Sequence, residues 1–522
     1  MSTLTQANSF RYMLNHKQKD AIFCLVVFLL YFIIYGILSF RFGMVVEEVH
    51  EGITLHHELY VANMRWGLAL WRAIFGYGAL PLVAGIISGA AIALSLLVHV
   101  RIFGIESFGK RLAYGVIYLC GIQWLYQLMY SNQSDVVALS FLLASIAVYL
   151  ITKNKDKKSV LFAVLLVMFS VACYQAILLY IFVLWGSFYI ICILNEQSLK
   201  TSAIVRAAFV FVVGALLSII VARVLMSTSL VTPSIVETVK NHQGDFIRWT
   251  RLEGLSTEMQ VRCVVRYMVT VPLTNMAGLT YPGQWVYASA LIPLVLIVRF
   301  VYKRNTVKHA MFVGAFLLFL LYVPFFMGVV FLHKMPPRVN IAEPLACAGV
   351  WAVFISRKSR YSARKINFFV SFLIAAILSS VYTVGAFART EAYSYNRAVM
   401  ELISMHSRGM QVASSAELTD FKIIIIGDPK FSRFVADEFY MKPGTLYRES
   451  VHPHIFSGNK KWIDFYVDYL RLPYIRCAGP DDLARYASSA KDMPSWPDIG
   501  SVQECEGNII IKVGEVPNTG SL

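Results

Sequence analysis

Long apolar stretches separated by short polar loops run through the first 388 residues of the chain. An apolar stretch of roughly eighteen residues or more is long enough to cross a bilayer as a helix. The stretch 159–195 is too long for one helix, and its polar break at Tyr174 and Gln175 predicts two helices joined by a tight turn. We therefore expect about eleven spans, at 21–40, 79–101, 112–130, 135–152, the two halves of 159–195, 203–225, 285–302, 310–332, 341–356 and 366–387.

Two segments depart from this pattern. Residues 227–265 form a long polar connection, and the Pro and Gly residues of 271–284 indicate a re-entrant or interfacial piece. In the tail 389–522, the β-branched runs 421–429 and 508–516 predict strands, while "AELTDF" and "DDLARYASSAK" predict helices. The fold class is thus an α-helical polytopic membrane protein, residues 1–388, with a small C-terminal α/β domain, residues 389–522.

Composition agrees with this class, and charge fixes its orientation. The chain is 57% hydrophobic, and its mean hydropathy is +0.60. The net charge is +16, but the tail carries −2, so the membrane part carries the whole basic excess. That excess lies mostly in the short loops "HKQK", "KNKDKK", "VYKRNTVKH" and "SRKSRYSARK". Short Lys/Arg-rich loops face the cytoplasm. We therefore expect a cytoplasmic N-terminus and an outer C-terminal domain, and no nucleic-acid partner.

The stretch 43–72, "GMVVEEVHEGITLHHELYVANMRWGLALWR", gathers ionisable residues directly after the first span. Glu47 and Glu48 stand at the hydrocarbon boundary, where charged groups usually line a polar cavity. As sequence neighbours they point in different directions, so one faces the cavity while the other braces it. The alternative is a pair of ordinary loop charges meeting headgroups. The nearby histidines lack the spacing of a zinc site, and we predict no metal.

The end of this stretch predicts a short interfacial helix that places Trp66, Leu70 and Ile74 on one face. Arg65 lies directly before this helix, and Arg72 lies within it. Each is a candidate for contact with lipid phosphates, with snorkelling to headgroups as the alternative.

A first span followed by an acidic pair, a lip helix of the "NMRWGLALWR" kind, many further spans and a polar tail resembles the GT-C membrane glycosyltransferases. Within these the chain is most similar to the serotype-converting O-antigen glucosyltransferases of the Gtr type II family. The resemblance covers roughly 15–390. It implies that an acidic residue at the start of the first outer loop is the catalytic base, which matches Glu47 and Glu48. Many relatives carry Asp there, and the choice between the two glutamates stays open.

The resemblance also implies a substrate chemistry. A polyprenyl-phosphate hexose would donate the sugar, glucose by family likeness, to a lipopolysaccharide O-antigen unit on the periplasmic face of the bacterial inner membrane. An inverting transfer needs a carboxylate base and cations for the departing phosphate. The candidate phosphate-binding cations are Lys334 and Arg338 in "HKMPPRVN", Arg65, and Arg251 (with Arg248 as an alternative). Asp245 and Trp249 are candidate acceptor contacts. No cofactor is expected, and the implied functional partners are membrane lipid, a donor-synthesising transferase and a flippase.

Two other functions compete with this one. An O-antigen polymerase would rely on arginine-rich outer loops rather than on an acidic pair in the first loop. A transporter or flippase for a lipid-linked glycan would place charged or broken helices near the bilayer midplane. Among the eight cysteines, Cys477 and Cys505 are the only two in the tail, and they are a candidate disulfide if the tail lies in an oxidising compartment.

Overall fold

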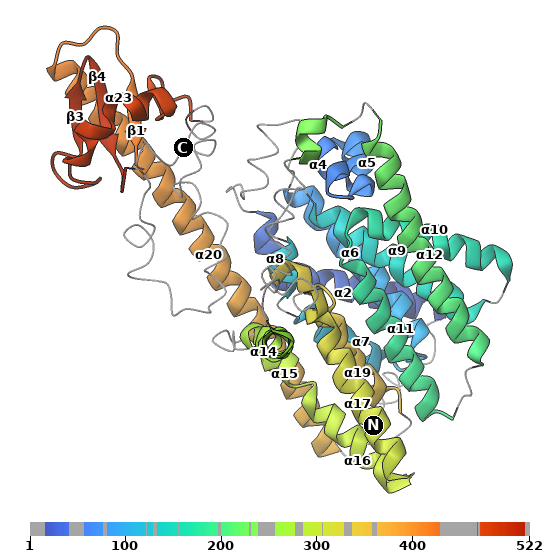
Figure 1. Cartoon of the computed structure of the whole chain (residues 1–522). Helices are drawn as coiled ribbons and strands as arrows, with labels where there is room; N and C mark the ends of the chain where they lie inside the picture. Colours follow the sequence, from blue (N-terminus) through green and yellow to red (C-terminus); the bar gives the residue numbers. More distant parts are fainter. Residues whose placement is uncertain are drawn as a thin grey trace. The chain divides into compact units, whose positions relative to one another are not determined.

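The chain divides into two compact units that part between Gly385 and Ala386. The computed structural model (Figure 1) describes residues 16–40, 57–76, 81–121, 123–128, 133–154, 156–196, 200–228, 231–237, 256–276, 285–304, 306–327, 337–357, 363–427, 467 and 470–516.

The first unit is helical throughout its described residues. Its α-helices are α2 (His16–Ser39), α4 (His57–Ala62), α5 (Trp66–Phe75), α6 (Pro81–Ile102), α7 (Phe108–Leu119), α8 (Gln123–Leu128), α9 (Ser134–Lys153), α10 (Lys157–Cys173), α11 (Ile177–Leu194), α12 (Thr201–Met226), α14 (Thr257–Met276), α15 (Trp285–Ala288), α16 (Leu291–Arg304), α17 (Val307–Tyr322), α19 (Glu343–Ile355) and the first part of α20 (Ala363–Ser415). Two 3₁₀ turns, η4 (Val323–Phe325) and η5 (Pro337–Asn340), complete it.

Eight helices in the described residues are long and apolar enough to cross a membrane. They are Lys17–Ser39, Pro81–Ile102, Ser134–Lys153, Ile177–Leu194, Thr201–Met226, Trp285–Arg304, Val307–Phe325 and Ile366–Arg389. Their outward faces carry exposed aliphatic side chains that water would not solvate favourably, as on α12, where Val205 is 61% exposed. The chain is therefore a polytopic helical membrane protein, as its sequence predicts.

The difference from eleven spans has local causes. The predicted span 112–130 is broken near Gly121 into α7 and α8. Pro344 approaches the chain at this break, where a Cβ on Gly121 would lie 2.5 Å from the proline ring. Helix α10 has 17 residues, and α19 has only 13. Thirteen residues rise about 20 Å, which is short of the roughly 30 Å hydrocarbon core.

The polar break inside 159–195 behaves as predicted, since α10 ends at Cys173 and α11 begins at Ile177. Helix α14, by contrast, was not expected, because its residues were assigned to a polar connection and an interfacial segment. Its sequence mixes Arg262 and Arg266 with valines and methionines, so no stretch within it is apolar enough to stand out.

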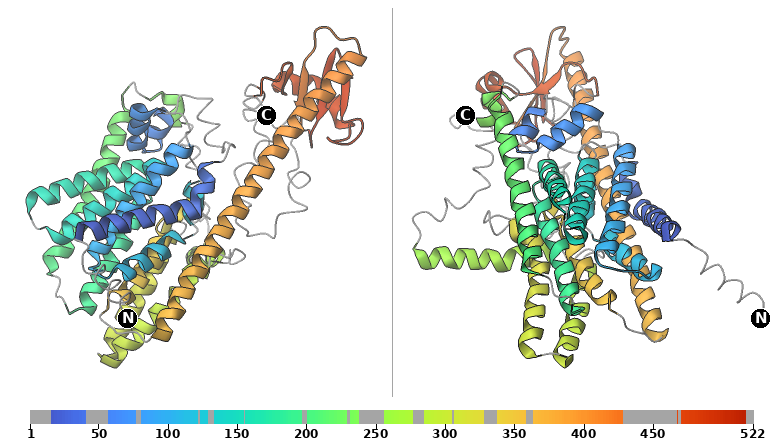
Figure 2. Two further views of the ribbon diagram at one scale, coloured as in Figure 1. Left: turned by 180° about the vertical axis from the view of Figure 1, so that it is seen from behind. Right: turned by 90° about the vertical axis from the view of Figure 1, so that its right-hand side faces the viewer.

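The second unit is built on a four-stranded sheet, shown in red and orange in Figure 2. Its strands are β1 (Ile423–Ile426), β2 (Ile475–Cys477), β3 (Val502–Cys505) and β4 (Asn508–Lys512). The order is β2-β1-β4-β3, with β1 parallel to both β2 and β4, and β3 antiparallel to β4. The two predicted strands correspond to β1 and β4, and helix α23 (Pro480–Lys491) forms as "DDLARYASSAK" predicts.

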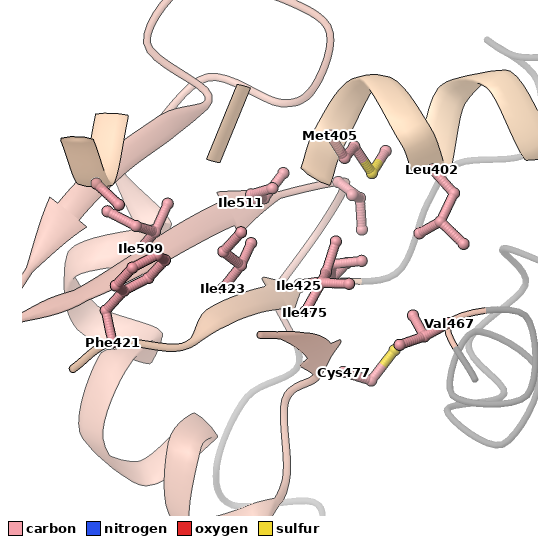
Figure 3. Close-up of a cluster of buried hydrophobic side chains, with 12 residues drawn as sticks. Leu402, Met405, Phe421, Ile423, Ile425, Val467, Ile475, Cys477, Ile509 and Ile511 are labelled. Atoms are coloured by element: carbon pink, nitrogen blue, oxygen red, sulfur yellow. The ribbon is translucent and has the colours of Figure 1, made fainter. Parts of the chain in front are cut away.

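Helices cover both faces of this sheet. One face packs against the end of α20 through Leu402 and Met405, which belong to one buried cluster with Ile423 and Ile511 of the sheet (Figure 3). The other face packs against α23 through Tyr486. The predicted helix at "AELTDF" is wrong, because α20 ends at Ser415 and the chain turns there before it enters β1.

Candidate functional site

The described part of the loop after the first span folds into two short helices joined by a tight turn. The Arg65 N–H donates to the Tyr60 carbonyl at 2.7 Å, and the Met64 N–H donates to the Val61 carbonyl at 2.8 Å. This pair of bonds is the Schellman arrangement that ends α4. It requires Met64 in the left-handed region, at φ 61°. The turn places Arg65 immediately before the first residue of α5.

This helix pair is fastened to the ends of α10 and α12 (Figure 1). Gly67 lies so close to α10 that a Cβ there would be 3.0 Å from the Cys173 nitrogen. The Trp66 indole N–H donates to the Ser218 carbonyl of α12 at 3.1 Å. We call this end of the first unit, where α10 and α12 end and α9 begins, the lip end. It is the end that the charge pattern predicts to face outward.

Glu58 of α4 ties the loop to the segment that follows α12. Its carboxylate accepts hydrogen bonds from the Thr232 N–H at 2.7 Å and from the Thr232 hydroxyl at 2.8 Å. The Glu58 carboxylate therefore holds the segment after α12 against α4.

Arg65 is held at the lip end by neutral groups. Its Nε donates to the Gln175 amide oxygen and its Nη1 donates to the Gln133 amide oxygen, each at 3.4 Å. Its guanidinium lies 5.0 Å from the centre of the Tyr174 ring. Gln175 is fixed in turn, because its amide donates to the Asn63 carbonyl at 2.5 Å. Among the described residues no carboxylate pairs with Arg65, so its charge remains available to an anion.

Arg72, two turns further along α5, has a different environment. It is buried and forms an ion pair with Asp135 of α9, at 2.5 Å from Nη2 to Oδ1 and 3.2 Å from Nη1 to Oδ2. The Trp71 indole N–H donates to the same carboxylate at 3.0 Å. The expectation that Arg72 reaches lipid phosphates or snorkels to headgroups is therefore wrong, because a carboxylate more than sixty positions away in sequence neutralises it.

A second polar cluster lies where α8 packs against η5 and the start of α19. The Gln123 amide donates to the carboxylate of Glu343, and both side chains are buried. Gln127, one turn further along α8, and Asn340 of η5 are each 1% exposed. Sequence reasoning missed this cluster because α8 falls inside an expected span. The two glutamines at positions i and i+4 were the available signal.

Most of the remaining site residues predicted from the sequence lie outside the part of the chain that the structure describes. Glu47, Glu48, Asp245, Trp249, Arg251 and Lys334 lie outside the described residues. The backbone of Arg338 belongs to η5, beside α8, while its side chain lies outside the described part. Arg65 is the one predicted phosphate-binding residue whose side chain is described, and it stays a prediction.

The candidate disulfide between Cys477 and Cys505 does not form. Both thiols are free. They lie on β2 and β3, the two edge strands, with β1 and β4 between them. Three strand spacings of about 4.8 Å separate these edges, whereas a disulfide needs Cα atoms within roughly 7 Å. The pairing prediction is wrong because the strand order places the two cysteines at opposite edges.

Comparison with known families gives one match. The family described as glucosyl transferase GtrII matches residues 49–356, which is more than half of the chain. The matched range contains the helix pair α4 and α5, Arg65 with its amide partners, and the polar cluster between α8 and η5, called the α8–η5 cluster below. No curated protein and no solved structure matches the chain.

Proposed function

Because the chain belongs to the GtrII glucosyl transferase family, we propose that it transfers a hexose, glucose by family likeness, from a polyprenyl-phosphate donor to a lipopolysaccharide O-antigen unit. The reaction takes place on the periplasmic face of the bacterial inner membrane. The family assigns glycosyltransferase activity, and the eight helices of spanning length place the activity in a membrane protein. The donor, the acceptor and the membrane face belong to the proposal.

The chemistry proceeds by a single displacement. The acceptor hydroxyl attacks the anomeric carbon while a first-loop carboxylate, Glu47 or Glu48, takes its proton. The bond between the anomeric carbon and the phosphate oxygen breaks, and polyprenyl phosphate departs with the electron pair. Attack from the face opposite the phosphate inverts the anomeric configuration.

The donor assignment rests on the contrast between Arg65, which precedes α5, and Arg72, which lies within it. Arg72 is neutralised by Asp135, whereas the partners of Arg65 among the described residues are amide oxygens and an aromatic ring. A cation held in this way can stabilise the negative charge that develops on a departing phosphate. The planar guanidinium also matches a phosphate in two-point geometry.

The other predicted contacts complete the proposed site. Lys334, Arg338 and Arg251 would share the phosphate charge with Arg65, and Asp245 and Trp249 would contact the acceptor. The position of Arg338 in η5 brings its backbone beside α8, within the family-matched range.

A lipid-carried donor fits the predicted topology. The charge pattern predicts that the first loop lies outside. Nucleotide sugars are absent there, so a sugar donor on that side would be carried by a lipid. A donor-synthesising transferase and a flippase would supply it. The second unit, predicted to be periplasmic, would then lie on the acceptor's side of the membrane.

The test uses Glu47→Gln and Glu48→Gln, each expressed in cells whose lipopolysaccharide is examined for an added hexose. We expect one variant to lose the hexose at normal protein abundance. Glu106→Gln is the matched control, because Glu106 is an exposed carboxylate in a predicted cytoplasmic loop. If the lipopolysaccharide still carries the added hexose in both first-loop variants, neither glutamate is the catalytic base. A change in O-antigen chain length instead of a side branch would point to a polymerase.

A further inference from the structure

The α8–η5 cluster contains buried polar atoms that have no hydrogen-bond partner in the described part of the chain. Both amide atoms of Gln127 lack a partner, as do the Gln123 amide oxygen and the Asn340 amide nitrogen. All three side chains are at least 96% buried. Buried amides are nearly always hydrogen-bonded in folded proteins. Three such side chains from two elements more than two hundred positions apart therefore need an explanation.

The geometry around Glu343 fixes what one of these groups offers. The Gln123 nitrogen donates to the Glu343 carboxylate, so its oxygen is left as an acceptor. Asn340 offers a donor, and Gln127 offers both a donor and an acceptor. Gln123 and Gln127 are four positions apart on α8 and share one face of the helix. The three side chains come from two elements that pack against each other, and they offer two free donors and two free acceptors without carrying a charge.

This combination fits a hydroxylated, uncharged ligand. A sugar hydroxyl both donates and accepts, and a ring carrying several hydroxyls satisfies several amide atoms at once. A phosphate offers only acceptors and would leave the Gln123 oxygen without a partner. Water also donates and accepts, so the two occupants must be separated by experiment.

We propose that Gln123, Gln127 and Asn340 bind the hydroxyl groups of a hexose ring during transfer. The inference rests on the proposed function and adds a sugar-binding subsite to it. The hexose can be that of the donor or that of the acceptor, because the hydroxyl chemistry is the same.

The test replaces Gln127 by methionine, which keeps its length and removes the amide. Removing an unpartnered buried polar group does not lower the stability of the empty protein, so we expect the melting temperature to stay constant or rise. With the full chain in lipid vesicles, we expect kcat/KM to fall about 10- to 100-fold, the effect of one or two lost hydrogen bonds to a buried partner. Ser187→Ala is the matched control, because the buried Ser187 hydroxyl on α11 has no hydrogen-bond partner among the residues that the structure describes. Its kcat/KM should equal that of the wild type.

Deoxy sugars identify the source of the hydroxyl. If the donor occupies the cluster, a polyprenyl-phosphate hexose lacking one hydroxyl will be a poor substrate for the wild type, and Gln127→Met will no longer differ from the wild type with it. If the acceptor occupies the cluster, the same convergence will occur with a deoxy acceptor instead.

Two results would overturn the inference. One is a Gln127→Met variant with wild-type kcat/KM for both substrates beside an active wild type. The other is a fall in melting temperature that accompanies the loss of activity, since that result indicates structural water. A wild-type chain that transfers no hexose from a lipid-linked donor would instead refute the proposed function, and this inference with it.

Discussion

The ion pair between Arg72 and Asp135 should be the main interaction that holds α5 against α9. Breaking this ion pair by mutation tests that role. Their side chains are 6% and 5% exposed, and three hydrogen bonds reach the carboxylate from α5. Arg72→Met leaves Asp135 buried without its cation. Breaking one partner of a buried pair costs about 3–5 kcal/mol, so we expect the free energy of unfolding to fall by that amount.

The double variant distinguishes the pair from its parts. In Arg72→Met/Asp135→Leu no charge is left buried, and replacement of a buried pair by apolar residues is nearly neutral. We therefore expect most of the lost stability to return, with a coupling energy of about 3 kcal/mol. The full chain is unfolded in mixed micelles by raising the proportion of a denaturing detergent, and tryptophan fluorescence reports the fraction unfolded.

A matched control is available on α14. Arg262 pairs with Glu258 at 3.2 Å, but these side chains are 78% and 83% exposed. Exposed pairs of this kind contribute little, so Arg262→Met should unfold as the wild type does. The reasoning would be refuted by an Arg72→Met variant that loses no more than this control, or by a double variant no more stable than either single one.

Three further predictions follow from single positions. Arg65→Met should lower hexose transfer by about 100-fold or more at an unchanged melting temperature, because its own protein contacts are long; equal loss of stability and activity would contradict this. Met64→Gly should raise the free energy of unfolding by about 1 kcal/mol, since φ is 61° there; a fall in stability would count against the strained turn. Gly427→Ala should destabilise the second unit by more than about 1 kcal/mol, because φ is +101° and a Cβ would lie 2.8 Å from the Gly514 oxygen. Gly507→Ala, at φ +77° in open space, should cost less, and hydrogen exchange in β1 measures both.

The sequence predicts those features of the fold that depend on local pattern. Apolar length alone marks the spans, the isoleucine run of β1 marks a strand, and Tyr174 with Gln175 marks the turn between α10 and α11. Features that depend on distant partners escape it. At the break near Gly121 the chain meets Pro344, which lies more than two hundred positions away.

In the candidate site, too, local features could be predicted from the sequence and features that depend on distant partners could not. Arg65 could be singled out because an arginine beside a lip helix suits a phosphate. The different environment of Arg72 could not be predicted, because Asp135 meets it only after α9 packs beside α5. The two tail cysteines could not be placed without the strand order. The glutamines of α8 were overlooked because, in an apolar stretch, they resemble tolerated polar residues of a span.

The central claim is hexose transfer from a lipid-linked donor, and a purified system tests it most directly. The full chain in vesicles would receive polyprenyl-phosphate glucose labelled in the sugar, with an O-antigen oligosaccharide as acceptor and no nucleotide sugar. The account predicts label in the oligosaccharide, with an anomeric configuration opposite to that of the donor. Transfer that requires a nucleotide sugar, or a product that keeps the donor's configuration, would contradict it.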